Sequence, residues 1–326
     1  MPQLNFIQAI NSALAEEMER DPLTFLMGED VVLGAFGATK GLIDKFGAQR
    51  VRNTPISEAG FVGAAVGAAM AGTRPICEVE FASFFYCAFD QVCNQAAKLR
   101  YMSGGQARLP ITFRAVFGAM GGAAAQHSET VYAQFLSVPG LKLVVPSGPA
   151  DVKGLLKSAI RDDNPVIFFE AERLYAVKGE VPEGELLIPI GKAEVKREGK
   201  DVSLITWSRM YYYVEQAAAQ LEQTGVSAEI LDLRSLRPLD EEAIVTTAKK
   251  TNRVVIIEEG WPHAGMGAQI AYLLQQKAFD YLDAPVVRVT GLDVNMSYAA
   301  NLENLIQPTQ TRILDAVNQV LYRQEK

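Results

Sequence analysis

Residues 202–233 read VSLITWSRMYYYVEQAAAQLEQTGVSAEILDL, and their pattern decides the fold class. The apolar run Val202 to Trp207 is typical of a buried strand, and the segment from Tyr212 to Gln223 has helical character. Gly225 is a helix-ending signal that precedes a second apolar run, Ala228 to Leu233. A strand, a helix and a strand in this order predict a parallel sheet covered by helices.

The same alternation continues to the C-terminus. Asp240 is a predicted N-cap for a helix that reaches about Lys250. Further strands are expected at Val254–Glu258 and Val286–Val289, and further helices at Ala268–Leu282 and Thr309–Tyr322.

The N-terminal half alternates less regularly. Helices are predicted at Phe6–Arg20, Glu58–Ala71, Ala88–Met102 and Ala150–Ile160. Strands are predicted at Thr24–Met27, Arg74–Val79, Pro110–Arg114, Leu141–Val145 and Val166–Phe169. Ligands of open α/β sheets bind outside the carboxyl ends of the strands, where Glu29, Glu80 and Arg114 lie in this sequence. Pro, Gly and acidic residues accumulate at Gly179–Glu185, so we expect domains at 1–185 and 186–326.

Composition narrows the class of protein. The chain has 326 residues, enough for about two domains, and its 49% hydrophobic and 21% charged residues are typical of a globular protein. The net charge is -7, whereas a nucleic-acid-binding protein is expected to carry a positively charged surface. The most apolar run, Gly60 to Gly72, is shorter than a membrane helix, and no signal peptide is visible, so we expect a cytoplasmic protein. Cys77, Cys87 and Cys93 are expected to be buried or half-buried thiols.

The predicted helix that begins at Glu58 carries glycines on one face. Gly60, Gly63 and Gly67 share that face, and each interior glycine costs about 1 kcal/mol relative to alanine. Such a face allows another backbone to approach closely. That backbone belongs either to a helix or sheet of the same chain or to another subunit, and the two interpretations are compatible.

Glu58 itself has two interpretations. Its apolar neighbours Ile56 and Phe61 would disfavour a charged carboxylate and make Glu58 a candidate proton donor or acceptor. Alternatively, it is a first-turn glutamate that the helix dipole stabilises.

The chain has two histidines, the residue type best suited to proton transfer near neutral pH. His127 lies in the small-residue segment Gly121–Ser128, which leaves the backbone room to approach a ligand. A nucleophilic pair of His127 and Ser128 is disfavoured, because adjacent residues seldom orient each other and no orienting acid is evident. We interpret His263 as a structural loop histidine.

Motifs along nearly the whole chain resemble those of the beta subunits of thiamine-diphosphate-dependent 2-oxo acid dehydrogenases. They are Met27–Val31, Thr54–Gly60, Phe89–Gly105, Ala125–Ser128, Pro139–Lys142, Lys153–Leu156, Arg161–Pro165, Glu258–Pro262 and Leu282–Pro285. The resemblance implies two three-layer α/β domains with mainly parallel sheets. The first would be the pyrimidine-binding thiamine diphosphate domain, and the second would resemble the transketolase C-terminal domain.

The resemblance also implies a cofactor site. Thiamine diphosphate supplies the carbanion chemistry, while the protein positions and activates it. At the place of Glu58 the family has a glutamate that hydrogen-bonds a ring nitrogen of the aminopyrimidine. By the same similarity, Phe84 would face the pyrimidine, Glu29 and Ile56 would lie nearby, and His127 would help to transfer the acyl group to a lipoyl group.

Metal sites and partners are implied in the same way. The family binds potassium at the positions of Ile111, Ala159, Ile160, Asp162 and Asn164. The chain has no Gly-Asp-Gly motif for the magnesium that holds the diphosphate, and in the family that ion belongs to an alpha subunit. We therefore expect an alpha-2-beta-2 heterotetramer that shares the cofactor and acylates the lipoyl domain of a dihydrolipoyl acyltransferase core. Its location would be a bacterial cytoplasm or, for a mature chain, an organellar matrix.

The motifs are compatible with more than one substrate. Pyruvate dehydrogenase, acetyl-transferring, is our first interpretation: the complex would decarboxylate pyruvate and reductively acylate lipoyl-lysine. The segment Arg114–Met120 leans toward acetoin-dehydrogenase relatives, whereas Gly260–Pro262 favours the pyruvate type. The alternatives are an acetoin dehydrogenase or branched-chain 2-oxo acid dehydrogenase beta subunit, or a non-catalytic assembly subunit.

Overall fold

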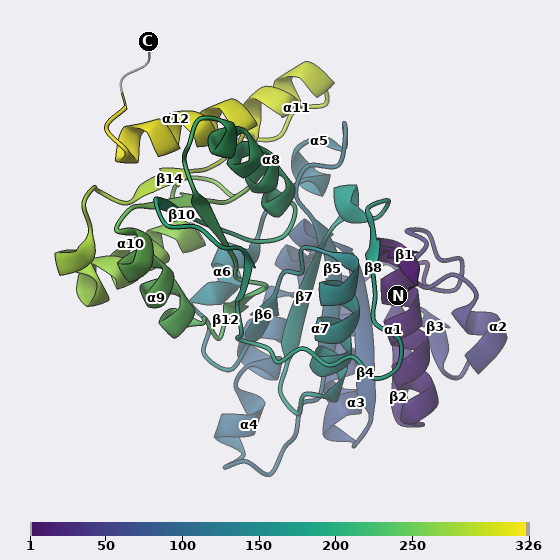
Figure 1. Cartoon of the computed structure of the whole chain (residues 1–326). Coiled ribbons are helices and arrows are strands. Elements are labelled where there is room, and N and C mark those ends of the chain that lie inside the picture. Colours follow the sequence, from purple (N-terminus) through teal and green to yellow (C-terminus); the bar gives the residue numbers. More distant parts are fainter. Residues whose placement is uncertain (1, 324–326) are drawn as a thin grey trace. The chain divides into compact units, whose positions relative to one another are not determined.

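A computed structural model describes residues 2–323 of the chain (Figure 1). The residues cluster into two compact units. The first contains the residues up to Phe117 together with Gln134–Ile190, and the second contains Gly118–Ala133 together with the residues from Gly191 onward. The sequence predicts a single boundary after residue 185. The division into units differs from it, because the segment Gly118–Ala133 of the N-terminal half clusters with the second unit.

The first unit is built on a parallel sheet with the strand order β6-β7-β5-β4-β2-β3. The strands are β2 (Thr24–Gly28), β3 (Val51–Asn53), β4 (Arg74–Phe81), β5 (Thr112–Phe117), β6 (Lys142–Val144) and β7 (Val166–Ala171). All residues of β2, β5 and β7 are buried, as expected of a sheet covered on both faces.

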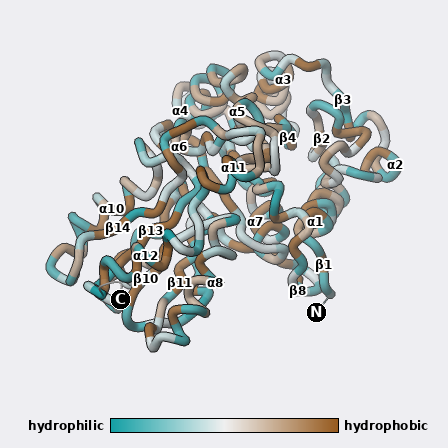
Figure 2. Tube along the Cα trace, turned by 90° about the horizontal axis from the view of Figure 1, so that it is seen from above, coloured by the Kyte–Doolittle hydropathy of each residue, from teal (hydrophilic) through white to brown (hydrophobic). Residues whose placement is uncertain are grey.

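Helices α1 (Phe6–Arg20) and α7 (Pro149–Arg161) pack against each other in this unit (Figure 1). Asn5 and Gln8 form a reciprocal capping box that fixes the start of α1. Hydrophobic and hydrophilic colours alternate along α1, as expected of a helix with one buried face (Figure 2). The remaining elements are the antiparallel strands β1 (Gln3–Asn5) and β8 (Lys178–Glu180), and the short helices α2 (Leu42–Phe46), α4 (Leu99–Met102) and η3 (Glu172–Leu174). The short helix α6 (Tyr132–Leu136) spans the division between the units, because its first two residues cluster with the second unit.

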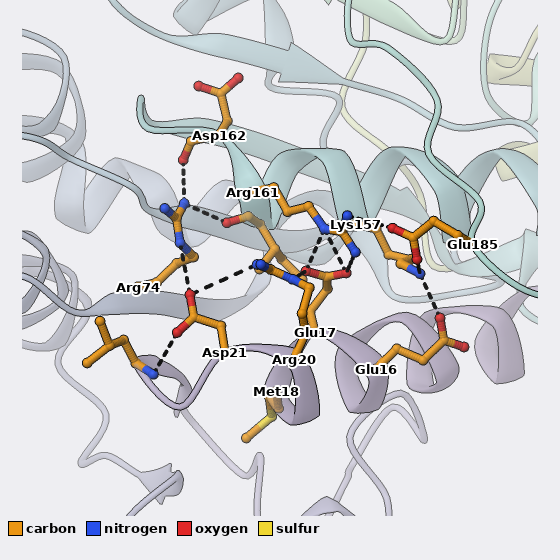
Figure 3. A network of polar contacts seen from close by, with 12 residues as sticks. Glu16, Glu17, Met18, Arg20, Asp21, Arg74, Lys157, Arg161, Asp162 and Glu185 are labelled. Atoms are coloured by element: carbon orange, nitrogen blue, oxygen red, sulfur yellow. Dashed lines mark hydrogen bonds and ion pairs between the residues drawn. The ribbon is translucent and has the colours of Figure 1, made fainter.

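Ion pairs join α1, α7 and the segment that follows β8 (Figure 3). The Lys157 ammonium lies 2.8 Å from Glu16 and 2.9 Å from Glu185. The fully buried Glu17 accepts hydrogen bonds from Arg161 and from Arg20. Burial opposes the charge of Glu16, but hydrogen bonds from its lysine partners lower its pKa to about 2.

The glycine-bearing helix α3 (Glu58–Met70) packs against β4 and the helical turns η1 (Ala82–Ala88) and η2 (Gln91–Ala96). Its glycine face does not make the close intrachain contact that its sequence allows. Gly60 and Gly67 are exposed, and a Cβ atom at Gly67 would meet no atom of the described residues within 4 Å. A small-residue surface of this helix is therefore left uncovered by the chain itself.

The segment Ala88–Met102 is mainly helical as predicted, but it does not form one regular α-helix. The chain instead forms the 3-10 turns of η1, the π-helical turn of η2 and the short α4. This winding brings Phe85 and Phe89 onto Phe135, with ring centroids 5.5 and 5.4 Å apart. Phe135 is distant in sequence, so the local residue pattern does not contain this constraint.

The second unit contains a sheet with the strand order β14-β13-β10-β11-β9, parallel except for the edge strand β9. The strands are β9 (Glu194–Arg197), β10 (Val202–Thr206), β11 (Ala228–Asp232), β13 (Val254–Ile257) and β14 (Val287–Val289), and the short strand β12 (Ser235–Arg237) does not belong to this sheet. The fully apolar β13 is coloured as hydrophobic in Figure 2. The edge strand β9 is half exposed and was not predicted.

Helices cover both faces of this sheet, with α8 (Met210–Gln223) and α12 (Gln310–Val320) on one face and α9 (Glu241–Thr251) and α10 (Met266–Lys277) on the other (Figure 1). Asp240 caps α9 as predicted, because its side chain accepts a hydrogen bond from the Ala243 amide. The shorter helices are α5 (Ala124–His127), η4 (Phe279–Tyr281) and α11 (Ala300–Ile306). The predicted three-layer α/β architecture with mainly parallel sheets is confirmed in both units.

The structure also shows the burial of the three cysteines and the length and polarity of the helices. Cys77 and Cys93 are buried, but Cys87 is exposed, so the expectation for Cys87 is wrong. Its place in the 3-10 winding of η1 turns it outward, which a helix register read from sequence does not indicate. None of the helices within residues 2–323 is long and apolar enough to cross a membrane.

Candidate active site

The carboxyl ends of β2 and β4 bring the first acidic residues together. Gly28 pairs with Glu78, and a Cβ atom at Gly28 would lie 2.3 Å from the Glu78 carbonyl oxygen. Only glycine allows the two strands to approach this closely. The next residue, Glu29, is therefore held at the end of β2 directly beside β4.

Glu29 carries a buried carboxyl oxygen. Its side chain is 7% exposed, and within residues 2–323 its Oε1 atom has no hydrogen-bond partner. Burial and the nearby charges of Glu58 and Asp30 raise the pKa of Glu29. A buried acceptor without a donor is costly, so this carboxyl suits a ligand that brings a hydrogen-bond donor.

Glu58 opens α3 and lies close enough to Glu29 for their charges to interact. In the isolated chain Glu58 is half-buried, and Ile56 is 82% exposed. Apolar neighbours of the same chain therefore do not enclose Glu58, in contrast to the first interpretation of its sequence. Any further enclosure must come from outside the described residues.

Phe84 is half-buried on η1, the element that packs against α3. Its ring meets the edge of Phe81 at a centroid distance of 5.2 Å, and Phe81 in turn meets Phe36 at 5.4 Å. This aromatic row gives one side of the acidic site an apolar surface. The predicted cofactor residues Glu29, Glu58 and Phe84 thus come from neighbouring elements of one unit.

Glu80 is an additional acidic residue of this site. Its φ of 56° is a left-handed conformation that few glutamates adopt, and the β4–β5 register shifts between Glu78 and Phe81. Burial and the charges of Glu29 and Glu58 raise the pKa of Glu80, so its carboxyl belongs to the same cluster. Its position near a strand end was visible in the sequence, but the irregularity that turns it toward Glu29 was not.

A buried ionic network supports this edge of the sheet. Arg114, 2% exposed, donates to Glu78 at 2.5 Å and to both oxygens of Glu170 at 2.7 and 3.0 Å. The Tyr175 hydroxyl donates to Glu170 at 2.8 Å. These contacts link the neighbouring strands β4, β5 and β7 through buried side chains.

His127 ends α5, and it belongs to the second unit. It is half-buried, and the following Ser128 is buried. His263 lies in a loop with its side chain 83% exposed, 3.5 Å from Asp293.

The five residues predicted for potassium lie close together in the first unit. Arg74 donates to the carbonyl oxygens of Ile160 and Asp162, both at 2.8 Å, and Lys142 contacts the Asp162 carboxylate. The oxygens of the other three residues also accept intrachain hydrogen bonds; the residues are Ile111, Ala159 and Asn164. Three cationic side chains and two backbone amides thus already donate to these oxygens, and the donor set gives no independent support for a potassium ion.

The fold and these sites agree with comparisons to known proteins. Residues 2–178 match the family "Transketolase, pyrimidine binding domain", and residues 191–313 match "Transketolase, C-terminal domain". The structure is similar to a solved protein titled "Split gene transketolase, inactive beta4 tetramer", with a TM-score of 0.81 and 26% identity over 99% of both chains. The chain is therefore a transketolase-type protein of two α/β domains.

Sequence relatives define the branch of this class. The chain is 50% identical to the pyruvate dehydrogenase E1 component subunit beta of Dictyostelium discoideum, a mitochondrial protein, over 97% of this chain and 90% of the relative. It is 48% identical to the same subunit of Rickettsia felis, over 98% and 99%. It is also 47% identical to the acetoin:2,6-dichlorophenolindophenol oxidoreductase subunit beta of Bacillus subtilis, over 98% and 97%. The chain belongs to the family of pyruvate dehydrogenase E1 component beta subunits and their acetoin relatives.

Proposed function

We propose that the chain is the β subunit of a thiamine-diphosphate-dependent pyruvate dehydrogenase, acetyl-transferring, and that it forms its active site together with an α subunit. Membership of the E1 beta family gives the reaction class. The observation that carries the site assignment is the buried, unpartnered Glu29 oxygen beside Glu58. This pair fits the donor groups of an aminopyrimidine ring, and Phe84 offers the ring an aromatic surface.

Each of the named site residues has a distinct role in this proposal. Thiamine diphosphate, when bound, supplies the stabilisation of a carbanion. Glu58 shares a proton with a ring nitrogen and so helps to activate the cofactor, while Glu29 accepts a hydrogen bond in the buried part of the site. Phe84 excludes water, and Ile56 does so once the partner covers it. His127 carries a proton during acyl transfer to the lipoyl group.

The α subunit completes the site in an alpha-2-beta-2 heterotetramer. The chain lacks the Gly-Asp-Gly motif, so we assign the magnesium and the diphosphate to the partner. The half-buried Glu58, the exposed Ile56 and the exposed glycine face of α3 are surfaces that a partner would cover. The similar β4 tetramer is titled inactive, which suits a chain that needs an unlike partner.

The lipoyl domain of a dihydrolipoyl acyltransferase would receive the acyl group. We place the complex in a bacterial cytoplasm or an organellar matrix, since the relatives include bacterial and mitochondrial proteins. Potassium at the five predicted residues stays a prediction from the resemblance, and no step depends on it. Its test is the activity of the complex with sodium in place of potassium.

A second candidate function is acetoin cleavage with the same cofactor. The similarity to the Bacillus subtilis acetoin enzyme subunit favours it nearly as strongly as the pyruvate relatives favour the first. Assays of the assembled complex against pyruvate, branched 2-oxo acids and acetoin in parallel would distinguish the substrates.

The assembly experiment tests the proposal. Thiamine diphosphate binding is measured by calorimetry on the chain alone and on the chain co-purified with its α subunit, and we expect binding only to the mixed assembly. Equal binding to the isolated chain would contradict a shared site.

Glu58→Gln tests the role of the carboxyl. The variant should still assemble, but exchange of the thiazolium proton of the bound cofactor, followed by NMR, should slow by about 10²-fold or more. The matched control is Glu183→Gln, an exposed glutamate of the same unit. Unchanged exchange in Glu58→Gln would remove this residue from the mechanism.

A further inference from the structure

The segment that carries His127 is held by carboxylates of the second unit. Residues 118–133 cluster with that unit although they lie within the N-terminal half of the sequence. The segment begins with glycines in left-handed conformations: φ is 80° at Gly118, 82° at Gly121 and 100° at Gly122. Glycine adopts these conformations without strain, but its backbone freedom means that the loop needs fixed hydrogen-bond acceptors to keep one conformation.

Glu303 supplies two of these acceptors from α11. The Gly121 amide donates to its Oε1 at 3.1 Å, and the Gly122 amide donates to its Oε2 at 2.7 Å. Glu303 is fully buried, so the two hydrogen bonds act without competition from solvent. The contact joins residues about 180 positions apart in the sequence.

Glu259 supplies a third acceptor at the end of β13. It accepts the Ala119 amide at 2.7 Å, and its carboxylate is itself held by Arg209 at 2.7 Å. Arg209 also donates to Gln307, the residue that follows α11, at 2.5 Å. The buried Arg209 therefore links Glu259 to the end of α11, the helix that carries Glu303.

The far end of the segment is attached in the same way. The Tyr132 hydroxyl donates to Glu258 at 3.2 Å, and Arg288 donates to that carboxylate at 2.7 Å. His127 thus lies between two attachment points, Ala119–Gly122 and Tyr132. Because α5 has only four residues, these contacts rather than a long helix attach the segment to the second unit.

We propose that Glu303 is a positioning residue that fixes the Gly118–Ala133 loop and thereby orients His127 for acyl transfer to the lipoyl group. The inference rests on the proposed role of His127. Glu303 acts through the Gly121 and Gly122 amides and does not touch the reacting groups. The loop order it provides is a property of this chain, separable from cofactor binding.

Hydrogen exchange of the full chain tests the loop contact directly. In Glu303→Gln one carboxylate oxygen becomes an amide nitrogen and the charge is lost, so we expect exchange of the peptide that contains Gly121 and Gly122 to accelerate about tenfold, and more in Glu303→Ala. The matched control is Asn304→Ala, which changes an exposed neighbour on the same helix and should leave the loop protected. Unchanged protection of this peptide in both Glu303 variants would overturn the proposal.

Activity of the assembled complex tests the positioning role. Glu303→Gln should reduce acylation of a lipoyl domain about tenfold, while decarboxylation read with an artificial electron acceptor stays within about twofold, a split that general destabilisation would not produce. Accelerated loop exchange with normal acylation would also overturn the positioning role. If His127→Ala acylates normally, the proposed role of His127 fails, whereas the exchange result still reports on the loop contact alone.

Discussion

Replacing Arg114 with methionine should destabilise the carboxyl edge of the first sheet more than any comparable surface change. The substitution keeps much of the side-chain volume but removes the guanidinium that lies between Glu78 and Glu170. Both carboxylates then stay buried without their cation. We expect the end of β5 to lose its link to β4 and β7.

The magnitude follows from the contacts. Arg114 makes three hydrogen bonds to carboxylates at 2.5, 2.7 and 3.0 Å, and its side chain is 2% exposed. Removal of one partner from a buried ion pair costs about 3–5 kcal/mol. That is a large share of the roughly 5–15 kcal/mol that stabilises a folded protein. Arg114→Lys keeps the charge but loses the fork geometry, so about 1–3 kcal/mol is expected.

The pH dependence has a definite sign. Burial raises the pKa of Glu78 even beside Arg114, and loss of the cation raises it further. A buried acid with a raised pKa favours the folded state most when it is protonated, at low pH. The difference in stability between Arg114→Met and the wild type should therefore be smaller at pH 5 than at pH 8.

The assay is hydrogen exchange of peptides from β4, β5 and β7, which resolves this sheet edge in a chain of two units. Arg108→Met is the control, because Arg108 is 73% exposed and its nearest carboxylate lies at 3.7 Å. A loss below about 1 kcal/mol in Arg114→Met, or a loss equal to the control, would refute the reasoning.

The remaining predictions concern catalysis and acid stability. His127→Ala should lower lipoyl acylation at least tenfold and leave the tetramer assembled, as measured by a lipoyl-domain assay and size-exclusion chromatography; wild-type acylation would count against the assignment. Glu16→Gln should cost about 1 kcal/mol at pH 7, a value reduced for solvent screening because the side chain is 35% exposed. Because the pKa of Glu16 is lowered to about 2, this difference should shrink as pH falls from about 4.5 toward 2 in urea titrations, and a constant difference would exclude the ion pairs with Lys153 and Lys157 as its source.

Local signals predicted regular elements well. The helix Phe6–Arg20 has the predicted bounds, since its capping box and apolar period both lie within the segment. Strands such as Val254–Ile257 were predicted because a short run of four β-branched residues is sufficient to define them. Helix boundaries failed where aromatic packing with Phe135 overrides the local period.

The site was predicted in part. The motif around Glu58 identified a candidate acid, and the strand end identified Glu29. The burial of Glu29 was not predictable, because it depends on the close pairing of Gly28 with Glu78. Glu80 joined the cluster only through an irregularity of β4 that no residue pattern announced.

The amino-acid sequence by itself determined the alternation of strands and helices, the family and the residue types available for catalysis, because these depend on near neighbours and on ordered motifs. Tertiary structure alone decided which distant carboxylates hold which backbone. It placed Glu303 on the Gly121 and Gly122 amides and Glu170 on Arg114. Buried polar groups need hydrogen-bond partners, and the fold decides which donor meets which acceptor. Because these partners lie far apart in the sequence, the local residue pattern does not identify them.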